Sequence, residues 1–342
     1  MFGSAEGRLG REFRSALLAA AQRGVRVRLL MDAFGSWALP DDFFLPLKRA
    51  RAGVHYFNPL RPWSFGVRDH RKLLVCDDAM AFVGGYNITD EFDGDGVTRG
   101  WCDLGGRITE ALLVGKLAAS FDELFTLADF HRKPLLRLRA FKRKARPAAA
   151  AEFLPSHPGR GASPFQAALH RDLDRAREVR IITAYFLPTR RVRRLLMRAV
   201  RNGGRVQLIL AGRSDVLVSQ LAGRSLYRHL LKAGVEIYEY QPQILHAKLL
   251  VIDGAVHLGS SNLDIRSLNL NYELMLRFDD PAIAAGAREI FERIRRHSRR
   301  IEPDTWFKSL AWWQRWQYHW ARFLVARIDP FVALRQFRAI NK

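Results

Sequence analysis

Two stretches of the chain, HRKLLVCDDAMAFVGGYN (70–87) and HAKLLVIDGAVHLGSSN (246–262), repeat the same order of residues. Each begins with a histidine, has a lysine two positions later, and continues as an apolar run, an acidic turn and a second apolar run. Asp253-Gly254 is a strong signal for a two-residue hairpin turn, and the first stretch is one residue longer. The two stretches therefore predict equivalent β-hairpins in a duplicated chain.

The segments before the two hairpins repeat as well. Residues 13–36 predict an amphipathic helix, a turn at Gly24 and an apolar strand, and residues 192–214 repeat this pattern. Residues 47–59 and 228–242 then each give a helix end, a glycine and a β-rich run. Helices and strands that alternate twice predict the α/β class, with a duplicated α/β/α sandwich and two pseudo-symmetric halves.

The duplication divides the chain into four parts. We expect a first domain at 1–130, a basic linker rich in Pro and Ala at 131–164, a second domain at 165–303 and a Trp-rich tail at 304–342. The second domain opens with a β-branched, aromatic strand at 177–188, whereas the first domain reaches its helix almost at once. We therefore expect the first domain to lack its N-terminal strand, as a truncated chain would.

The composition is that of a globular protein with a strong positive charge. Of the 342 residues, 48% are hydrophobic, and the formal net charge is +22. No stretch approaches the ~18 apolar residues of a transmembrane helix. Cys76 and Cys102 cannot form a disulfide framework and suit a reducing cytoplasm. The charge predicts a polyanionic partner, which is a nucleic acid, an anionic membrane or a phosphorylated substrate.

The His-x-Lys spacing suits chemistry on a phosphate. Residues i and i+2 of a strand point to the same face, about 6.6 Å apart, so that His70 with Lys72, and His246 with Lys248, can face one phosphate. One imidazole attacks phosphorus while the other protonates the leaving alkoxide, which gives a phosphohistidine intermediate. Two lysines offset the anionic charge, so this chemistry requires no metal and no cofactor.

Four further residues of the hairpins recur at matching positions. Asp77 and Asp253 fall at the turns, out of phase with the histidines, and are expected to fix local geometry. Small residues after each second strand let the backbone, Asn87 and Asn262 approach the phosphate oxygens.

Two acids beyond the hairpins complete the candidate site. A histidine nucleophile needs an acceptor at its other ring nitrogen, as in a catalytic triad. Asp103 follows the first hairpin and Glu273 follows the second. We expect each acid to orient the histidine of its own half.

The paired His-x-Lys-x4-Asp motifs resemble the phospholipase D superfamily. HAKLLVID (246–253) with GSSNLDIRSLNLNYE (259–273) resembles the second motif of bacterial cardiolipin synthases, in particular the shorter synthases without N-terminal membrane helices. The resemblance covers nearly the whole chain and implies a metal-independent transfer of a phosphatidyl group at a site between the halves. It implies His70 as the nucleophile and His246 as the acid and base.

The resemblance further implies that two phosphatidylglycerol molecules yield cardiolipin and glycerol. Three alternatives stay open: a phosphatidylethanolamine donor or glycerol acceptor, a hydrolytic phospholipase, and a nucleic-acid phosphodiesterase. A catalytically inactive lipid-binding scaffold is a fourth interpretation, which the two intact motifs disfavour.

The sequences of the linker and the tail indicate which polyanionic partner the protein binds. Residues 132–146 hold eight Lys or Arg and no acid, which fits either a solvated connector or a polybasic patch for anionic headgroups. Five of the eight tryptophans lie between Trp306 and Trp320, as in an interfacial helix, although a helix packed on the core is the alternative. This clustering favours an anionic phospholipid membrane over nucleic acid. We expect a peripheral enzyme on the cytoplasmic side of the inner membrane.

Overall fold

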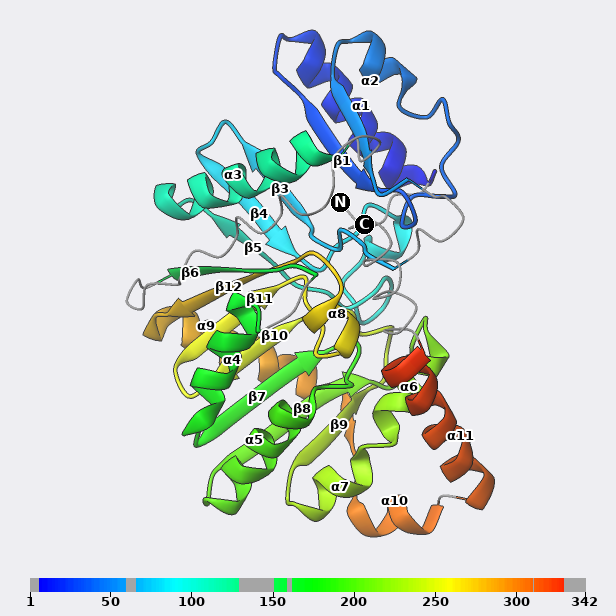
Figure 1. The fold of residues 1–342 in the computed structure, drawn as a ribbon, viewed down its shortest axis with the longest axis vertical. Helices are drawn as coiled ribbons and strands as arrows, with labels where there is room; N and C mark the ends of the chain where they lie inside the picture. The colour runs from blue at the N-terminus through cyan, green and yellow to red at the C-terminus, as the bar shows by residue number, and fades with distance from the viewer. Residues whose placement is uncertain (1–5, 60–65, 129–150, 159–161, 310, 329–342) are drawn as a thin grey trace, which may run out of the picture.

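The computed structural model describes residues 6–59, 66–128, 151–158, 162–309 and 311–328, which form two α/β halves and a C-terminal helical segment (Figure 1). The first half contains, in chain order, α1 (Arg8–Gln22), β1 (Arg28–Asp32), α2 (Leu45–Arg49), β2 (Gly53–Phe57), β3 (Leu73–Cys76), β4 (Met80–Gly84), the 3-10 helix η1 (Asp90–Phe92), β5 (Gly105–Ile108) and α3 (Ala111–Leu127).

The second half is larger. It contains, in chain order, β6 (Ala151–Ser156), α4 (Pro164–Asp174), β7 (Glu178–Thr183), α5 (Arg190–Arg201), β8 (Arg205–Ala211), α6 (Leu217–Arg224), α7 (Tyr227–Lys232), β9 (Glu236–Tyr240), β10 (Leu249–Ile252), β11 (Ala255–Gly259), α8 (Ile265–Asn269), β12 (Glu273–Asp279), α9 (Pro281–Arg296) and β13 (Ser298–Arg300). The C-terminal segment contains α10 (Pro303–Ser309), α11 (Trp312–Phe323) and the π-helix η3 (Leu324–Ile328).

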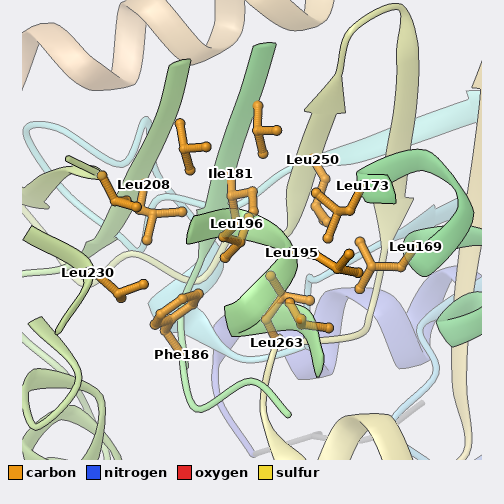
Figure 2. Close-up of a cluster of buried hydrophobic side chains, with 14 of the residues drawn as sticks. Leu169, Leu173, Ile181, Phe186, Leu195, Leu196, Leu208, Leu230, Leu250 and Leu263 are labelled. Carbon is orange, nitrogen blue, oxygen red and sulfur yellow. The ribbon is translucent and has the colours of Figure 1, made fainter. Parts of the chain in front are cut away.

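Local sequence explains why these helices form and which face they bury. In α5 the buried residues recur at the helical spacing of i, i+3, i+4 and i+7, and the side chain of Thr189 caps the first turn. That face packs on β7 and β8, where Ile181, Leu196 and Leu208 lie in one buried apolar cluster (Figure 2). Helix α9 covers the other face of the same sheet, with Phe291 fully buried.

The strand order shows the duplication. In the described part of the chain the second half forms one eight-stranded sheet with the order β13-β9-β8-β7-β10-β11-β12-β6. The first half has a parallel pair β1-β2 and a separate antiparallel sheet β3-β4-β5. Placed end to end, β2-β1 and β3-β4-β5 match β9-β8 and β10-β11-β12. The predicted duplicated α/β fold is therefore present.

The two sheets of the first half are separated where the second half has β7. Among the described residues no strand joins β1 to β3, whereas β7 pairs with both β8 and β10. A cavity lies at this position, lined by Leu29 of β1, Leu73 of β3, Phe13 and Leu17 of α1, and others. The matched positions Leu74 and Leu250 differ accordingly, with exposed fractions of 37% and 1%. Apolar side chains make up most of the cavity wall between β1 and β3, together with the charged residues Arg28, Asp69 and Arg71.

We expect a strand supplied to this space to stabilise the fold. A copy of residues 177–183 fused before Met1 leaves seven residues before α1, close to the six that separate β7 from α5. Burial of the exposed leucine and its neighbours contributes about 2 kcal/mol, which raises the melting midpoint by about 3 °C for a chain of this length. Calorimetry measures the shift. The matched control carries proline at the second and fourth strand positions, because proline removes ladder hydrogen bonds. Equal midpoints for both fusions would contradict the prediction.

The two halves share an apolar core. Ala81 and Val83 of β4 and Leu117 of α3 pack in one buried cluster with Leu274 and Leu276 of β12. This contact fixes one half against the other and brings the two hairpins to the same region of the molecule (Figure 1).

The predicted linker at 131–164 is wrong over its last part. Residues 151–156 form β6, which pairs antiparallel with β12 at the edge of the large sheet, and Ser163 caps α4. An edge position tolerates Pro155 because one side of the strand needs no ladder bond. The basic stretch at 132–146 lies outside the described residues.

One part of the Trp-rich tail packs on the second half, and another part is exposed. The ring of Trp306 stacks on Tyr318 and lies against Tyr227, so that this part packs on the second half. Trp312, Trp316 and other aromatic residues of α11 are exposed instead. Within the described residues no helix has the length and apolarity needed to span a bilayer.

Candidate functional site

Each predicted histidine lies in an extended segment that leads into the first strand of its hairpin. The backbone N–H of His70 donates to the carbonyl of Tyr272 at 2.9 Å, and that of His246 donates to the carbonyl of Cys102 at 2.7 Å. Each histidine segment is thus bridged to a segment of the other half. The partner segments continue directly into the two predicted acids.

The two acids therefore hold the histidines across the halves. His70 Nδ1 lies 3.0 Å from both carboxylate oxygens of Glu273, and His246 Nδ1 lies 2.6 Å from Asp103 Oδ2. The sequence-based prediction paired each acid with the histidine of its own half, and this pairing is wrong. The prediction that these acids orient the imidazoles agrees with the contacts, because each carboxylate accepts the Nδ1 proton and leaves Nε2 with its lone pair.

The lysines lie on the same side as their histidines. Lys72 Nζ donates to the carbonyl of His70 at 2.9 Å, and Lys248 Nζ donates to the carbonyl of His246. Lys248 Nζ also lies 2.8 Å from Nδ1 of the His246 ring. That nitrogen makes one hydrogen bond only, and the shorter contact with Asp103 assigns it as the donor to the carboxylate. The ammonium is left with further protons for an anion.

Burial sets the protonation of the lysines. Lys72 and Lys248 are both buried, and burial lowers the pKa of Lys72 to about 7 and that of Lys248 to about 8. Attraction to Glu273 and Asp103 opposes this effect in both cases. An anion between the two lysines would favour their charged forms.

The two histidines are neutral at pH 7, and the pKa values of the two acids are shifted in opposite directions. Burial lowers the pKa of His70 and lowers that of His246 well below its ordinary value. Burial raises the pKa of Asp103 to about 6. Burial also disfavours the charge on Glu273, but the attraction of His70 and hydrogen bonds from its neighbours hold the pKa of Glu273 below its usual value. Two neutral imidazoles beside cationic lysines form a site for nucleophilic chemistry on an anion.

The small residues after each second strand make room for the acids. A Cβ at Gly85 would collide with the carboxylate of Asp103, so only glycine fits here. The matched residue of the second half is Ser260, whose hydroxyl donates to Glu273 at 2.6 Å. The sequence predicted room for a phosphate at these positions. The structure shows that they position the acids.

The two asparagines lie at the ends of the matched loops. Asn262 is buried, and its Oδ1 accepts from the backbone N–H of Tyr185 at 3.4 Å and from the Thr183 hydroxyl at 3.5 Å. This arrangement leaves Nδ2 as a donor for a substrate oxygen. Asn87 is half-buried at the matched position of the first half.

The two aspartates of the hairpin turns lie away from the histidines. Asp77 is exposed and, like Asp253, has a left-handed backbone, with φ of 52° at both. Asp253 Oδ1 accepts from the backbone N–H groups of Arg177 and Glu178 at 3.0 and 2.8 Å, which ties the hairpin to the start of β7. The structure does not place these aspartates in the catalytic group. Asp253 fixes its turn against β7, as its phase along the strand predicts.

An aromatic cluster around His246 was not predicted. The rings of Phe92 and Trp101 lie 5.2 and 5.6 Å from the His246 ring, and Tyr86 packs on Phe92. Trp101 stands two residues before Asp103, which was the available sequence signal. The cluster limits water around this imidazole, which is buried.

A buried carboxylate also supports the first histidine segment. Asp32, at the end of β1, accepts from the backbone N–H of Asp69 at 3.0 Å and from the Arg68 guanidinium at 3.4 Å. Burial raises the pKa of Asp32 to about 6. Among the described residues, no three His, Cys, Asp or Glu side chains are grouped as metal ligands.

Comparisons with known proteins agree with this geometry. A family model described as "Cardiolipin synthase, PLD-like domain" matches residues 6–93 and 169–295, one segment in each half. Cardiolipin synthase B of Salmonella typhi is 31% identical over 98% of this chain and 81% of the relative. Cardiolipin synthase B of Escherichia coli is 30% identical over 97% and 80%.

Two solved structures share the fold. The phosphatidylserine synthase of Haemophilus influenzae superposes with a TM-score of 0.69 at 16% identity, over 97% of this chain and 89% of that protein. The polyphosphate kinase of Porphyromonas gingivalis gives 0.54 at 16% identity, over 89% of this chain and 44% of that protein. With the duplicated fold, the two histidine hairpins and relatives that match almost the whole chain, this protein belongs to the phospholipase D-like cardiolipin synthase family.

Proposed function

We propose that this protein transfers a phosphatidyl group from one phosphatidylglycerol to another, which makes cardiolipin and releases glycerol. The observation that carries the proposal is the pair of imidazoles, each held at Nδ1 by a carboxylate from the opposite half. Two ring nitrogens with available lone pairs supply a nucleophile and an acid–base group for one phosphodiester.

The first half-reaction forms a phosphohistidine. His70 Nε2 attacks phosphorus and forms a P–N bond while the P–O bond to glycerol breaks. The imidazolium of His246 donates its proton to the departing oxygen. Before substrate binds, the His246 imidazole is neutral. The entering phosphodiester anion and the carboxylate of Asp103 at Nδ1 both favour its protonated form. Glu273 stabilises the positive charge that develops on His70.

The second half-reaction reverses the roles. A hydroxyl of the second phosphatidylglycerol gives its proton to His246, attacks phosphorus and displaces His70. The ammonium groups of Lys72 and Lys248 offset the charge on the non-bridging oxygens, and Asn262 Nδ2 donates to one of them. The aromatic rings beside His246 favour an alcohol with a lipid attached over water as the acceptor.

Product analysis tests the proposal. The purified protein is incubated with phosphatidylglycerol vesicles and chelator, and the products are identified by mass spectrometry. Cardiolipin with an equal amount of glycerol is the expected result. Phosphatidic acid as the main product would assign a hydrolase instead. Phosphatidylethanolamine added as donor and glycerol added as acceptor test the other transferases, and a labelled oligonucleotide tests the phosphodiesterase.

The pH profile provides a further prediction. Lys72 and Lys248 lose their protons as the pH rises through about 7 and about 8. His246, whose pKa lies well below its ordinary value, also loses the proton that the first half-reaction requires. Both effects act in the same direction, so kcat/KM should fall as the pH rises above ~7. The histidine pKa values lie below the ordinary value, so protonation of the nucleophile lowers the rate only below pH ~6.5. Initial rates on soluble short-chain phosphatidylglycerol measure the profile. A value of kcat/KM that stays constant up to pH ~9 would contradict it.

We also propose that the protein is attached peripherally to the cytoplasmic face of the inner membrane through α11. Trp312, Trp316 and Trp320 follow each other at four-residue spacing, with exposed fractions of 74%, 63% and 58%, and Phe323 continues the stripe. Tyr318 and Ala321 on the opposite side of the helix are buried. An exposed tryptophan stripe on a protein of net charge +22 suits an anionic headgroup layer.

Removal of two of these rings should weaken membrane binding. The variant with Trp316→Ala and Trp320→Ala should bind phosphatidylglycerol-containing vesicles about 10- to 100-fold more weakly, because each ring loses about 1 kcal/mol or more of interfacial burial. Vesicle sedimentation measures binding, and turnover of a soluble short-chain substrate should stay unchanged. Trp37→Ala is the matched control, since Trp37 is 72% exposed in the first half. An equal loss of vesicle binding with Trp37→Ala would show that the stripe is not the specific membrane contact.

A further inference from the structure

A second cavity lies outside the catalytic group, between the start of α5 and the C-terminal helices. It has a volume of about 470 Å³ and is lined by Arg190 and Arg193 of α5, Arg322 of α11 and several apolar side chains. The cavity contains none of the catalytic histidines, lysines or acids. It needs its own explanation.

The cavity concentrates positive charge, with no paired carboxylate among the residues that the structure describes. No carboxylate of the described residues forms an ion pair with Arg190, Arg193 or Arg322. Nε of Arg193 is buried and has no hydrogen-bond acceptor. Burial and the neighbouring Arg322 and Arg190 lower the pKa of Arg193. Three guanidinium groups that repel one another around a cavity are stabilised by an anion, and guanidinium forks match phosphate oxygens.

The remaining walls of the cavity are mainly apolar, with Thr189 and His319 as the other polar residues. Leu187, Ile265 and Phe323 line it together with the arginines. Phe323 packs edge-on against Trp320 and belongs to the exposed aromatic stripe of α11. A ligand with its phosphate at the arginines therefore has an apolar path that leads to the proposed membrane face.

We propose that these three arginines form a second lipid site, which binds the phosphate of one anionic phospholipid while its glycerol backbone and acyl chains follow Phe323 toward the bilayer. The proposal rests on the proposed membrane contact of α11 and adds a specific lipid to it. The site takes no part in the transfer reaction. It holds the second half against the membrane beside the catalytic loop, because Leu187 N–H donates to the carbonyl of Leu263, the residue after Asn262.

The number of bound lipids tests the proposal. The full chain carries His70→Ala to prevent turnover and is titrated with dihexanoylphosphatidylglycerol, and native mass spectrometry counts the lipids on each chain. The pocket variant adds Arg190→Gln, Arg193→Gln and Arg322→Gln. The charge-matched control adds Arg191→Gln, Arg194→Gln and Arg201→Gln, which are exposed residues of the same helix outside the cavity.

The control is expected to bind two lipids, and the pocket variant one, with at least a tenfold loss at the second site. Two lipids on both variants would overturn the proposal. Because Arg193 is partly buried, a variant with only Arg190→Gln and Arg322→Gln repeats the count, with melting curves to verify folding. In a second experiment, glycerol 3-phosphate replaces the lipid in the same titration. Binding as tight as that of the lipid would overturn the lipid assignment and leave a small-anion site.

The same proteins separate this proposal from the proposed reaction. With His70 restored, the pocket variant should still make cardiolipin from soluble phosphatidylglycerol at the rate of the charge-matched control. Failure of the unaltered chain to make cardiolipin would overturn the reaction and leave the lipid count as a separate result. A pocket variant that loses the soluble reaction as well would place the arginines in catalysis and contradict the proposed second site.

Discussion

A chain with His246→Ala should release one equivalent of p-nitrophenolate from phosphatidyl-p-nitrophenol and then stop, whereas a chain with His70→Ala should release none. On phosphatidylglycerol both variants should lose at least about 10⁴-fold in rate, because the reaction requires a nucleophile and a proton donor. The activated substrate separates these roles, since p-nitrophenolate leaves without a proton. The first step then needs only the nucleophile held by Glu273.

The variant that releases one equivalent should also retain the phosphatidyl group. Without His246 no base activates the acceptor alcohol, so the phosphohistidine on His70 accumulates and its mass is measurable on the intact chain. Asp77→Asn is the matched control, because it alters the same motif at an exposed turn and asparagine tolerates the left-handed backbone there. The reverse pattern would make His246 the nucleophile. Release by neither variant would refute the covalent mechanism.

The repeat in the sequence predicted the architecture well where the signals are local. The helix and the strand predicted within 13–36 correspond to α1 and β1, and the two histidine stretches form hairpins β3-β4 and β10-β11. Apolar periodicity and turn residues specify these elements through neighbours a few positions away. Strand β6 was missed because a short edge strand with a proline takes its stability from pairing with β12, which no local pattern reports.

The sequence predicted which residues form the candidate site, but not which carboxylate contacts which histidine. Spacing and recurrence identified both histidines, both lysines and the two acids, which all lie buried in the structure. The crossing of the acids depends on two backbone bridges between the halves, at Tyr272 and at Cys102. Those bridges are set by how the shared apolar core docks one half on the other, so no spacing within either half encodes them. The cluster of Phe92 and Trp101 around His246 has the same origin.

The crossed pairing has a large expected effect on catalysis. Glu273→Gln and Asp103→Asn should each lower kcat about 10²- to 10⁴-fold, because an amide can donate to Nδ1 and favour the tautomer with its proton on Nε2. The shapes of the side chains are unchanged, so melting curves should show folded proteins. Initial rates of cardiolipin formation measure the loss. A loss of less than about tenfold for both variants would show that the carboxylates do not set the tautomers.

Single-turnover kinetics then test which acid serves which histidine. In a chain that already carries His246→Ala, the release of p-nitrophenolate depends on His70 alone. Glu273→Gln added to this chain should slow the release about 10²- to 10⁴-fold, as in the chain with His246, since Glu273 holds His70 Nδ1 at 3.0 Å. Asp103→Asn should leave the release nearly unchanged, because its partner ring is already absent. Pairing within each half would give the opposite result, so this comparison measures directly that each half of the duplicated chain completes the site of the other.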